Sequence, residues 1–462
     1  MPAHTFLPSL IIFLVCYIFI ASEKVDKTIV AVLGAALMIC THQIGHNAAV
    51  EKIDLNVIFL LIGMMICVNI LASTGLFEWI AIVTAQVAKG NGPRLLMLML
   101  LVTAFLSAFL DNVTTIILVA PITILITQLL EIPTTPFLIL EAIFSNIGGT
   151  GTLVGDPPNI IIGSQTHLSF NDFILHLGPI ALFILLVVGL IVRFRIGSAF
   201  DVSESAKENL MQAEPRLAII RPGRLKKALP CMGLVLLGFF FSHSLHIETG
   251  IIALTGGFLM CLVCREDIHH ALGKLEWNTI MFFIGLFMMV GALEVNGLFE
   301  LLGTKVMDVT NGNLLVTALA ILWFSAITSA FLDNIPLVIS FIPILESIIP
   351  GFAVQAGLDP GSPEAIRTIA EPLYWSLALG ACLGGNGTVI GASANVVISQ
   401  IAHRNKYKLS FADFFKMGFP ILIVSVTLSS GYIYLRYFKL MDRDPAPIES
   451  VVNHLEPATR NP

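Results

Sequence analysis

A six-residue stretch, SAFLDN, occurs twice in this chain, and each copy lies inside a long apolar segment. The copies span Ser107–Asn112 and Ser329–Asn334, which places Asp111 and Asp333 222 residues apart. A charged side chain at the centre of a membrane costs about 2.5–3.5 kcal/mol on insertion scales, and such residues usually serve ion or proton pathways. An aspartate also caps a helix, and we expect that role here, but serine or asparagine would cap without burying a charge. The repeated pair therefore predicts a site that binds a cation or carries a proton.

A second repeated motif is rich in glycine. The stretch GGTGTLVGDPPN at Gly148–Asn159 matches GGNGTVIGASAN at Gly384–Asn395, and apolar residues flank both. Glycines, hydroxyls and prolines cannot continue an α-helix, so we expect a helix broken at mid-membrane, with free amides for an anion and free carbonyls for a cation. A surface turn is the alternative, but each flank is about half a membrane long. Asp156–Pro158 becomes Ala392–Ala394, which makes the first half-site the more acidic.

The composition indicates the class of protein that must hold these motifs. Of the 462 residues 56% are hydrophobic and only 12% are charged, whereas about a quarter of residues are charged in soluble domains. We therefore predict an all-α polytopic membrane protein whose first apolar run is retained as a span. The net charge of −6 says little about partners. Cys261 and Cys264 form a CxxC motif without a second pair, and no histidines cluster at mid-membrane, so we expect no cofactor and no enzyme activity.

Apolar length divides the chain into spans. A span needs about 20 apolar residues, and the candidates are 6–22, 28–44, 56–74, 137–165, 176–195, 229–244, 250–264, 278–296, 372–402 and 415–437. The segments 95–130 and 313–349 are too long for one span and carry the Asp-Asn pair near the middle, as the tip of a re-entrant hairpin would. Backbone at that depth must be buried in protein or line a water-filled cavity.

The two halves of the chain repeat each other. NVIFLLIGMMICVNILASTGLFEWI from Asn56 matches NTIMFFIGLFMMVGALEVNGLFELL from Asn278, and the same offset of 222 residues holds through the SAFLDN copies. We predict a first repeat at 1–195 with its broken helix at 137–165, a cytoplasmic linker at 196–228, a second repeat at 229–440 with its broken helix at 372–402, and a tail at 441–462. Each repeat has five spans and a hairpin. Because five is an odd number of crossings, the two repeats have opposite orientations in the membrane, as in secondary transporters.

Basic residues set the expected orientation. The linker and its flanks hold basic residues that include Arg193, Arg195, Arg216, Arg221, Arg224, Lys226 and Lys227. Because cytoplasmic loops are enriched in lysine and arginine, we place the linker inside and both termini outside. The basic residues after the last span would then lie outside, against this rule.

The hairpin tips and glycine-rich breaks resemble the ion transporter superfamily, in particular its arsenite permease, sodium/proton antiporter and P-protein branch with a citrate transporter-like domain. The resemblance covers essentially the whole chain. It implies an elevator-type transporter with a scaffold domain and a transport domain. In the related sodium–dicarboxylate symporters the tips read Ser-Asn-Thr and bind sodium, whereas here they read Asp111–Val113 and Asp333–Ile335. Carboxylates in place of hydroxyls favour protons as the coupling ion, and they do not exclude sodium in that role.

The resemblance also implies which residues bind solute or ion, with each hairpin tip facing one break. They are Asp111, Asn112, Thr114, Thr150, Thr152, Asp156 and Asn159 in the first half, and Asp333, Asn334, Asn386, Thr388 and Asn395 in the second. Glu141 lies just before the first break and is interpreted either as a proton relay or as a structural carboxylate. No firm metal site is expected, but the pattern does not exclude Na⁺ binding at the Asp111 and Asp333 tips.

Three functions fit this pattern. The first is proton-coupled efflux of arsenite or antimonite across the cell (plasma or inner) membrane, because neutral As(OH)₃ offers hydroxyls to Asp, Asn and Thr. The second is a sodium/proton antiporter. An organic-anion (dicarboxylate) symporter ranks third, because the Ser-Asn-Thr signatures are absent. A channel would not need a repeated closed site.

The expected partners follow from these functions. They are membrane lipid, a small inorganic solute, and protons or Na⁺, with no nucleic acid. No nucleotide-binding loop is present, so any ATPase drive would need a separate subunit. A homodimer is suggested by analogy with relatives alone.

Overall fold

The computed structural model describes residues 6–22, 24–166, 168–196, 202, 204–212 and 214–439. Throughout these residues the regular secondary structure is helical, which agrees with the predicted all-α class. Nine helices in the described part are long and apolar enough to cross a membrane. They are α4 (Leu55–Ala72), α6 (Gly92–Phe109), α7 (Asn112–Leu129), α11 (Gly178–Ile196), α13 (Pro222–Leu245), α16 (Trp277–Val295), α18 (Leu314–Phe331), α19 (Asn334–Gln355) and α23 (Phe411–Ile433).

Shorter helices complete the described structure. They are α1 (Leu7–Ser22), α2 (Lys27–Cys40), α3 (His46–Glu51), α5 (Leu76–Val87), α8 (Thr134–Thr150), α9 (Pro157–Gln165), α10 (Phe170–His176), α12 (Glu204–Gln212), α14 (Thr249–Cys264), α15 (Ile268–Gly273), α17 (Leu298–Val309), α20 (Pro363–Ala365), α21 (Glu371–Gly384) and α22 (Ser393–Arg404). Single turns of 3-10 or π-helix lie at Pro215–Ala218, Ile366–Ala370, Gly385–Gly387 and Tyr434–Lys439. The predicted tail, 441–462, lies outside the described residues.

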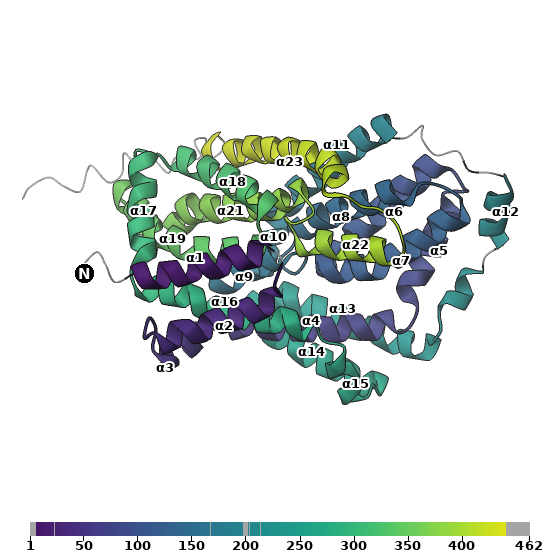
Figure 1. Cartoon of the computed structure of the whole chain (residues 1–462), viewed down its shortest axis with the longest axis horizontal. Helices are drawn as coiled ribbons and strands as arrows, with labels where there is room; N and C mark the ends of the chain where they lie inside the picture. Colours follow the sequence, from purple (N-terminus) through teal and green to yellow (C-terminus); the bar gives the residue numbers. More distant parts are fainter. Residues whose placement is uncertain are drawn as a thin grey trace, which may run out of the picture.

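The helices form two layers (Figure 1). The lower layer contains α1, α2, α4, α13, α14 and α16, and the upper layer contains α6 to α11, α18, α19 and α21 to α23. Small residues let helices of the lower layer approach closely. A Cβ added to Gly63 would lie 2.1 Å from the main chain of Ala253, and one added to Gly285 would lie 2.6 Å from that of Ala31. Close backbone contact of this kind replaces the missing hydrophobic drive between helices in lipid.

Two helical hairpins enter the upper layer from opposite ends of the molecule (Figure 1). The hairpin α6–α7 covers the predicted segment 95–130, and α18–α19 covers the predicted segment 313–349. Both tips lie near the centre of the long axis, where the breaks of α8–α9 and α21–α22 also lie. Each tip is a single Leu-Asp pair between two helices, and the aspartate is the N-cap of the returning helix, as expected.

Helix boundaries recur between the two halves of the chain. Gly75 and Gly297 are both N-caps in the left-handed region, with φ of 84° and 78°. Asn91 and Asn313 are both N-caps. The side chain of each accepts a hydrogen bond from the backbone amide three residues further along the chain. Because the repeated sequence produces the same caps and turns at the same offset, the two halves share one local structure.

The first two helices differ from the expectation of full spans at 6–22 and 28–44. α1 has 16 residues and α2 has 14, so each is short of the roughly 20 residues that a span needs. In Figure 1 α1 runs from the left-hand end to the centre, and α2 returns from there toward the same end. The turn between them therefore lies beside the hairpin tips, with Lys27 at the start of α2.

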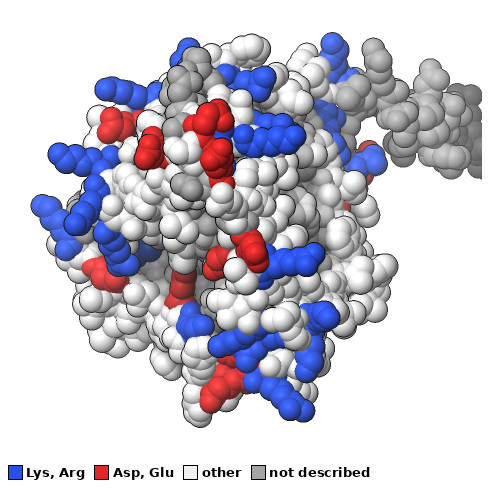
Figure 2. Space-filling model, turned by 90° about the vertical axis from the view of Figure 1, so that its right-hand side faces the viewer, with Lys and Arg blue, Asp and Glu red and all other residues white. Residues whose placement is uncertain are grey.

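The predicted linker contains structure of its own. Within 196–228 the chain forms α12 and a 3-10 turn, and α13 begins at Pro222, before the predicted second repeat. The amide of Ile220 donates to the carbonyl of Thr74 at 3.0 Å, which ties the linker to the α4–α5 turn. This linker end is the right-hand end of Figure 1, and Figure 2 shows lysine and arginine side chains spread over it. Helix α1 begins at the opposite end of the molecule.

Candidate functional site

The two breaks are held by matching polar contacts. In the first, the side-chain amide of Asn159 donates to the carbonyls of Thr150 and Thr152 at 3.1 and 2.8 Å. In the second, Asn395 donates to the carbonyls of Gly385 and Thr388 at 2.7 and 2.9 Å. These asparagines satisfy carbonyls that the interrupted helices leave free. Both were predicted as binding residues, and their amide groups are engaged in holding the breaks.

Each break is also fastened to its own hairpin. The hydroxyls of Thr152 and Thr388 donate to the carbonyls of Ala108 and Ala330, which precede the tips by a few residues. The hydroxyl of Thr150 donates to the carbonyl of Asn146 in its own helix at 2.7 Å. Thr152 and Thr388 therefore position the hairpin tips, and the hydroxyl proton of Thr150 is used within its own helix.

Asn146 joins the two halves at the centre of the upper layer. Its amide nitrogen donates to Oδ1 of Asn386 at 3.0 Å and to Oδ1 of Asn395 at 3.1 Å, both in the second half. Its Oδ1 accepts a hydrogen bond from Asn112 at 3.2 Å. Asn146 is fully buried and was not among the predicted site residues. Its equivalent in the second repeat is Cys382, so a comparison of the repeats gave no signal for it.

Asp156 is the carboxylate that both hairpin tips reach. Its Oδ1 accepts hydrogen bonds from Asn112 at 3.1 Å and from Asn334 at 3.4 Å, and the side chain is 1% exposed. Within the described residues, Oδ2 of Asp156, Oδ1 of Asn112 and Nδ2 of Asn386 are buried without a hydrogen-bond partner. A buried polar atom without a partner is costly, and these three atoms belong to side chains that Asn146 and Asp156 link by hydrogen bonds. The set contains two acceptors and one donor.

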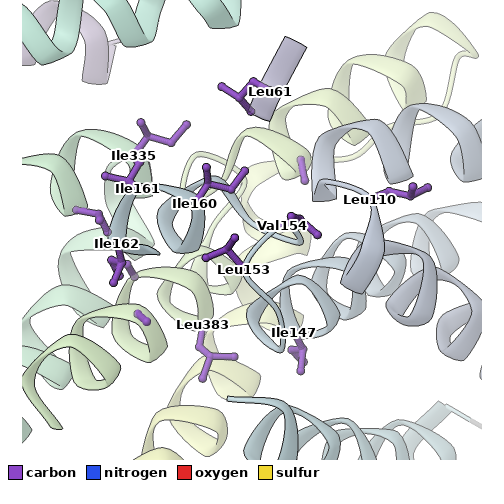
Figure 3. Close-up of a cluster of buried hydrophobic side chains, with 14 of the residues drawn as sticks. Leu61, Leu110, Ile147, Leu153, Val154, Ile160, Ile161, Ile162, Ile335 and Leu383 are labelled. Atoms are coloured by element: carbon purple, nitrogen blue, oxygen red, sulfur yellow. The ribbon is translucent and has the colours of Figure 1, made fainter. Parts of the chain in front are cut away.

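Aliphatic side chains enclose this polar centre. Figure 3 shows Leu153 and Val154 of the first break together with Ile147 and Leu383 from the two broken helices. Each of the four is at most 3% exposed. Surroundings of this kind keep water out and strengthen every electrostatic interaction inside.

A cavity of about 620 Å³ lies between the two layers. It is lined by both hairpin-tip acids, Asp111 and Asp333, by Glu276 at the start of α16, and by Lys27 at the start of α2. Oδ1 of Asp111 accepts the amide of Thr114 at 2.9 Å, and its other oxygen accepts the Thr114 hydroxyl. Asp333 instead forms an ion pair with Lys27, with 2.7 Å between Nζ and Oδ2. The tips thus face an acid-lined cavity as well as the buried centre.

The structure brings the predicted residues into one region with two different environments. Asn112, Asp156, Asn334 and Asn386 belong to the buried centre, and Asp111 and Asp333 face the cavity. Asp333 and Asn334 were expected to face the second break, but Asn334 bonds to Asp156 of the first. Sequence reasoning missed Lys27, Asn146, Glu276 and Ser393. For Lys27 the available signal was a lysine at the start of an apolar run. No group of three His, Cys, Asp or Glu side chains in the described part could hold a metal ion.

Glu141 contacts α7, the returning helix of the first hairpin, and not the tip at Asp111. Its Oε1 accepts the hydroxyl of Thr123 on α7 at 2.5 Å, and the side chain is fully buried. This contact agrees with the structural role, while Oε2 of Glu141 is buried without a partner in the described part. We expect Glu141→Gln, which keeps an acceptor for Thr123, to retain transport and thermal stability, whereas Glu141→Leu lowers the melting temperature. Loss of proton coupling in a stable Glu141→Gln protein would instead support a relay.

Comparison with known proteins places the chain among transporters. It is 41% identical over 435 residues to an uncharacterized transporter of Mycobacterium tuberculosis, covering 93% of this chain and 98% of that one. It is 38% identical over 430 residues to a 46 kDa membrane protein of Mycobacterium leprae, covering 92% and 97%. It is 32% identical over 503 residues to the human P protein, covering 91% of this chain and 59% of the P protein.

The fold has a counterpart among solved structures. The YdaH transporter of Alcanivorax borkumensis matches with a TM-score of 0.55 and 14% identity, covering 93% of this chain and 97% of that one. The citrate transporter family model matches residues 17–380. These matches confirm the ion transporter superfamily and a multi-pass membrane protein. The chain is therefore a membrane transporter that belongs to the citrate transporter family.

Proposed function

We propose that this chain exports arsenite or antimonite in exchange for protons, with the hairpin tips and broken helices forming one binding region. The observation that carries the proposal is the set of three unpartnered buried atoms on Asn112, Asp156 and Asn386. A neutral trihydroxy solute both donates and accepts hydrogen bonds, so it can satisfy two acceptors and one donor together. A metal cation would satisfy the two acceptors and leave the amide of Asn386 without a partner.

The buried carboxylate supplies the coupling. Asp156 lies in a dry centre, where its Oδ1 accepts amide hydrogen bonds from Asn112 and Asn334 and no described cation pairs with it, so its charged form gains little compensation there. A proton on Asp156 removes that charge when solute is absent, and a bound solute hydroxyl compensates for the charge when the proton leaves. Binding of solute and binding of protons thus compete, which is the condition for exchange.

Movement of the upper layer against the lower layer would carry the site across the membrane. The proposed site residues lie on hairpins and breaks of the upper layer. The cavity lies between their tips and the helices α2 and α16 of the lower layer, and Lys27 crosses it to Asp333. Within the upper layer, hydrogen bonds from Thr152 and Thr388 keep the breaks and hairpins together. This arrangement supports an elevator mechanism in which the upper layer is the transport domain.

A sodium/proton antiporter is the second candidate, and the charge of the cavity favours it. The cavity lining includes the acids Asp111, Glu276 and Asp333 and the basic residue Lys27. An acid-rich cavity attracts a cation and repels an anion, so it disfavours citrate and other carboxylates as solutes.

The test uses the purified full-length chain in liposomes that contain a pH-sensitive dye and hold an imposed pH gradient. We expect arsenite or antimonite to dissipate the gradient, while Na⁺ and citrate have no effect. Dissipation by Na⁺ alone would replace the first candidate with the second. Dissipation by citrate alone, or by none of the four solutes, would overturn the proposal.

A further inference from the structure

Lys27 reaches from the lower layer to the tip of the second hairpin. Its ammonium group lies 2.7 Å from Oδ2 of Asp333 and 3.0 Å from the hydroxyl of Ser393, the first residue of α22. It also lies 4.9 Å from the ring centre of Phe282 on α16. The hydroxyl of Ser393 donates to the same carboxylate oxygen at 3.2 Å. The lysine therefore bridges α2 to both elements of the second half-site.

The first half-site has a different arrangement. The residue equivalent to Lys27 in the second repeat is Thr249, which carries no charge. Asp111 is satisfied within its own helix by the amide and hydroxyl of Thr114. Among the described residues, Asp333 pairs with a cation of the opposite layer, and Asp111 forms no such ion pair.

We propose that Lys27 is an exchangeable counter-ion of Asp333: its ammonium group holds the hairpin tip against the lower layer and leaves when Asp333 takes up a proton. This inference rests on the proposed proton coupling and deepens it. A protonated Asp333 has no charge to hold the ammonium group, so proton uptake frees the upper layer to move. Lys27 is thus a positioning residue, and the proton on Asp333 opens the contact between the layers.

Other charged and titratable groups face the same cavity. They are Tyr17 on α1, Asp26 on α2, Glu276 at the start of α16, and Asp111 at the other hairpin tip. Two of these acids, Asp111 and Glu276, retain the ammonium group in the cavity after it leaves Asp333. Lys27 is 36% exposed and Asp333 is 12% exposed, so the ammonium group has room to move while the carboxylate does not.

The first experiment does not depend on transport. Melting temperatures of the purified full chain are compared for Lys27→Gln, Asp333→Asn and the double variant, near neutral pH and in acid. We expect the effects of the two single changes to be non-additive near neutral pH and additive in acid, where the pair is already broken. Additive effects at both pH values would overturn the inference while leaving the proposed function intact.

The second experiment follows the pH profile of transport in liposomes with the solute identified above. Lys27→Gln removes the positive charge that pairs with Asp333, so it should shift the half-maximal pH of transport upward. Lys27→Arg should keep the profile of the unaltered chain. The matched control is Lys52→Gln, because Lys52 forms a 2.6 Å ion pair with Glu294 at 34% exposure within the lower layer. An unshifted profile in Lys27→Gln, or an equal shift in Lys52→Gln, would contradict the inference.

Discussion

Replacing Asp333 with asparagine is expected to reduce proton-coupled transport to the background of empty liposomes while the chain still folds. Asp111→Asn is expected to do the same. Both aspartates are N-caps whose side chains accept amide hydrogen bonds, and asparagine caps a helix about as well as aspartate does. The substitution therefore removes the titratable group and preserves the cap. The measurement is solute-driven collapse of a pH gradient, with a melting curve of each variant.

Asp26→Asn is the matched control for these variants. Asp26 also lines the cavity and is also an N-cap, with its side chain accepting the amides of Thr28 and Ile29. It lies in the lower layer and outside the hairpins, so Asp26→Asn should keep most of the transport activity. Full activity in both Asp111→Asn and Asp333→Asn would mean that the tip acids only cap helices.

Gly149→Val is expected to prevent stable folding. A Cβ at this position would lie 2.3 Å from the carbonyl oxygen of Gly155 on the other side of the break. That neighbour is main chain, so it cannot rotate away, and the two ends of the break would have to separate. Overpacking of this kind typically costs about 1–3 kcal/mol, and here it would also break the contacts around Asp156. The expected result is a large fall in melting temperature or aggregation in detergent.

Gly151→Ala is the control for that substitution. Gly151 lies two residues further along the same break, and a Cβ there would meet the Cβ of Ala181 at 3.4 Å, an ordinary van der Waals distance. Its φ of −74° suits alanine. We expect Gly151→Ala to fold and to transport, and a melting temperature as low as that of Gly149→Val would show that the break tolerates no added side chain.

The hairpins and breaks were predictable because their signals are local. An acid within an apolar run and paired glycines beside prolines have few structural solutions in a membrane, and the repeat supplied each signal twice. The caps at Asp111 and Asp333, the hairpins, and the break at Asp156 all follow from such local chemistry. The family resemblance then indicated which polar residues would come together.

The remaining features depend on contacts between distant parts of the chain. Lys27 and Asp333 are 306 residues apart, and a lysine at the start of an apolar run also fits a residue at the membrane surface. Asn146 has Cys382 as its equivalent, so the comparison between repeats could not reveal it. The lengths of α1 and α2 depend on where the turn between them is held, and apolar length does not reveal that position. Asn334 bonds across the repeats because the two tips meet at a single carboxylate.

The central claim is that solute and protons compete for one buried site around Asp156. Proton release on solute binding tests it most directly, with purified chain in weakly buffered detergent solution and solute binding measured in parallel by equilibrium dialysis. The unaltered chain should release protons in proportion to the arsenite or antimonite it binds, and Asp156→Asn should release none. Binding without proton release by the unaltered chain, or the same release from Asp156→Asn, would contradict the claim.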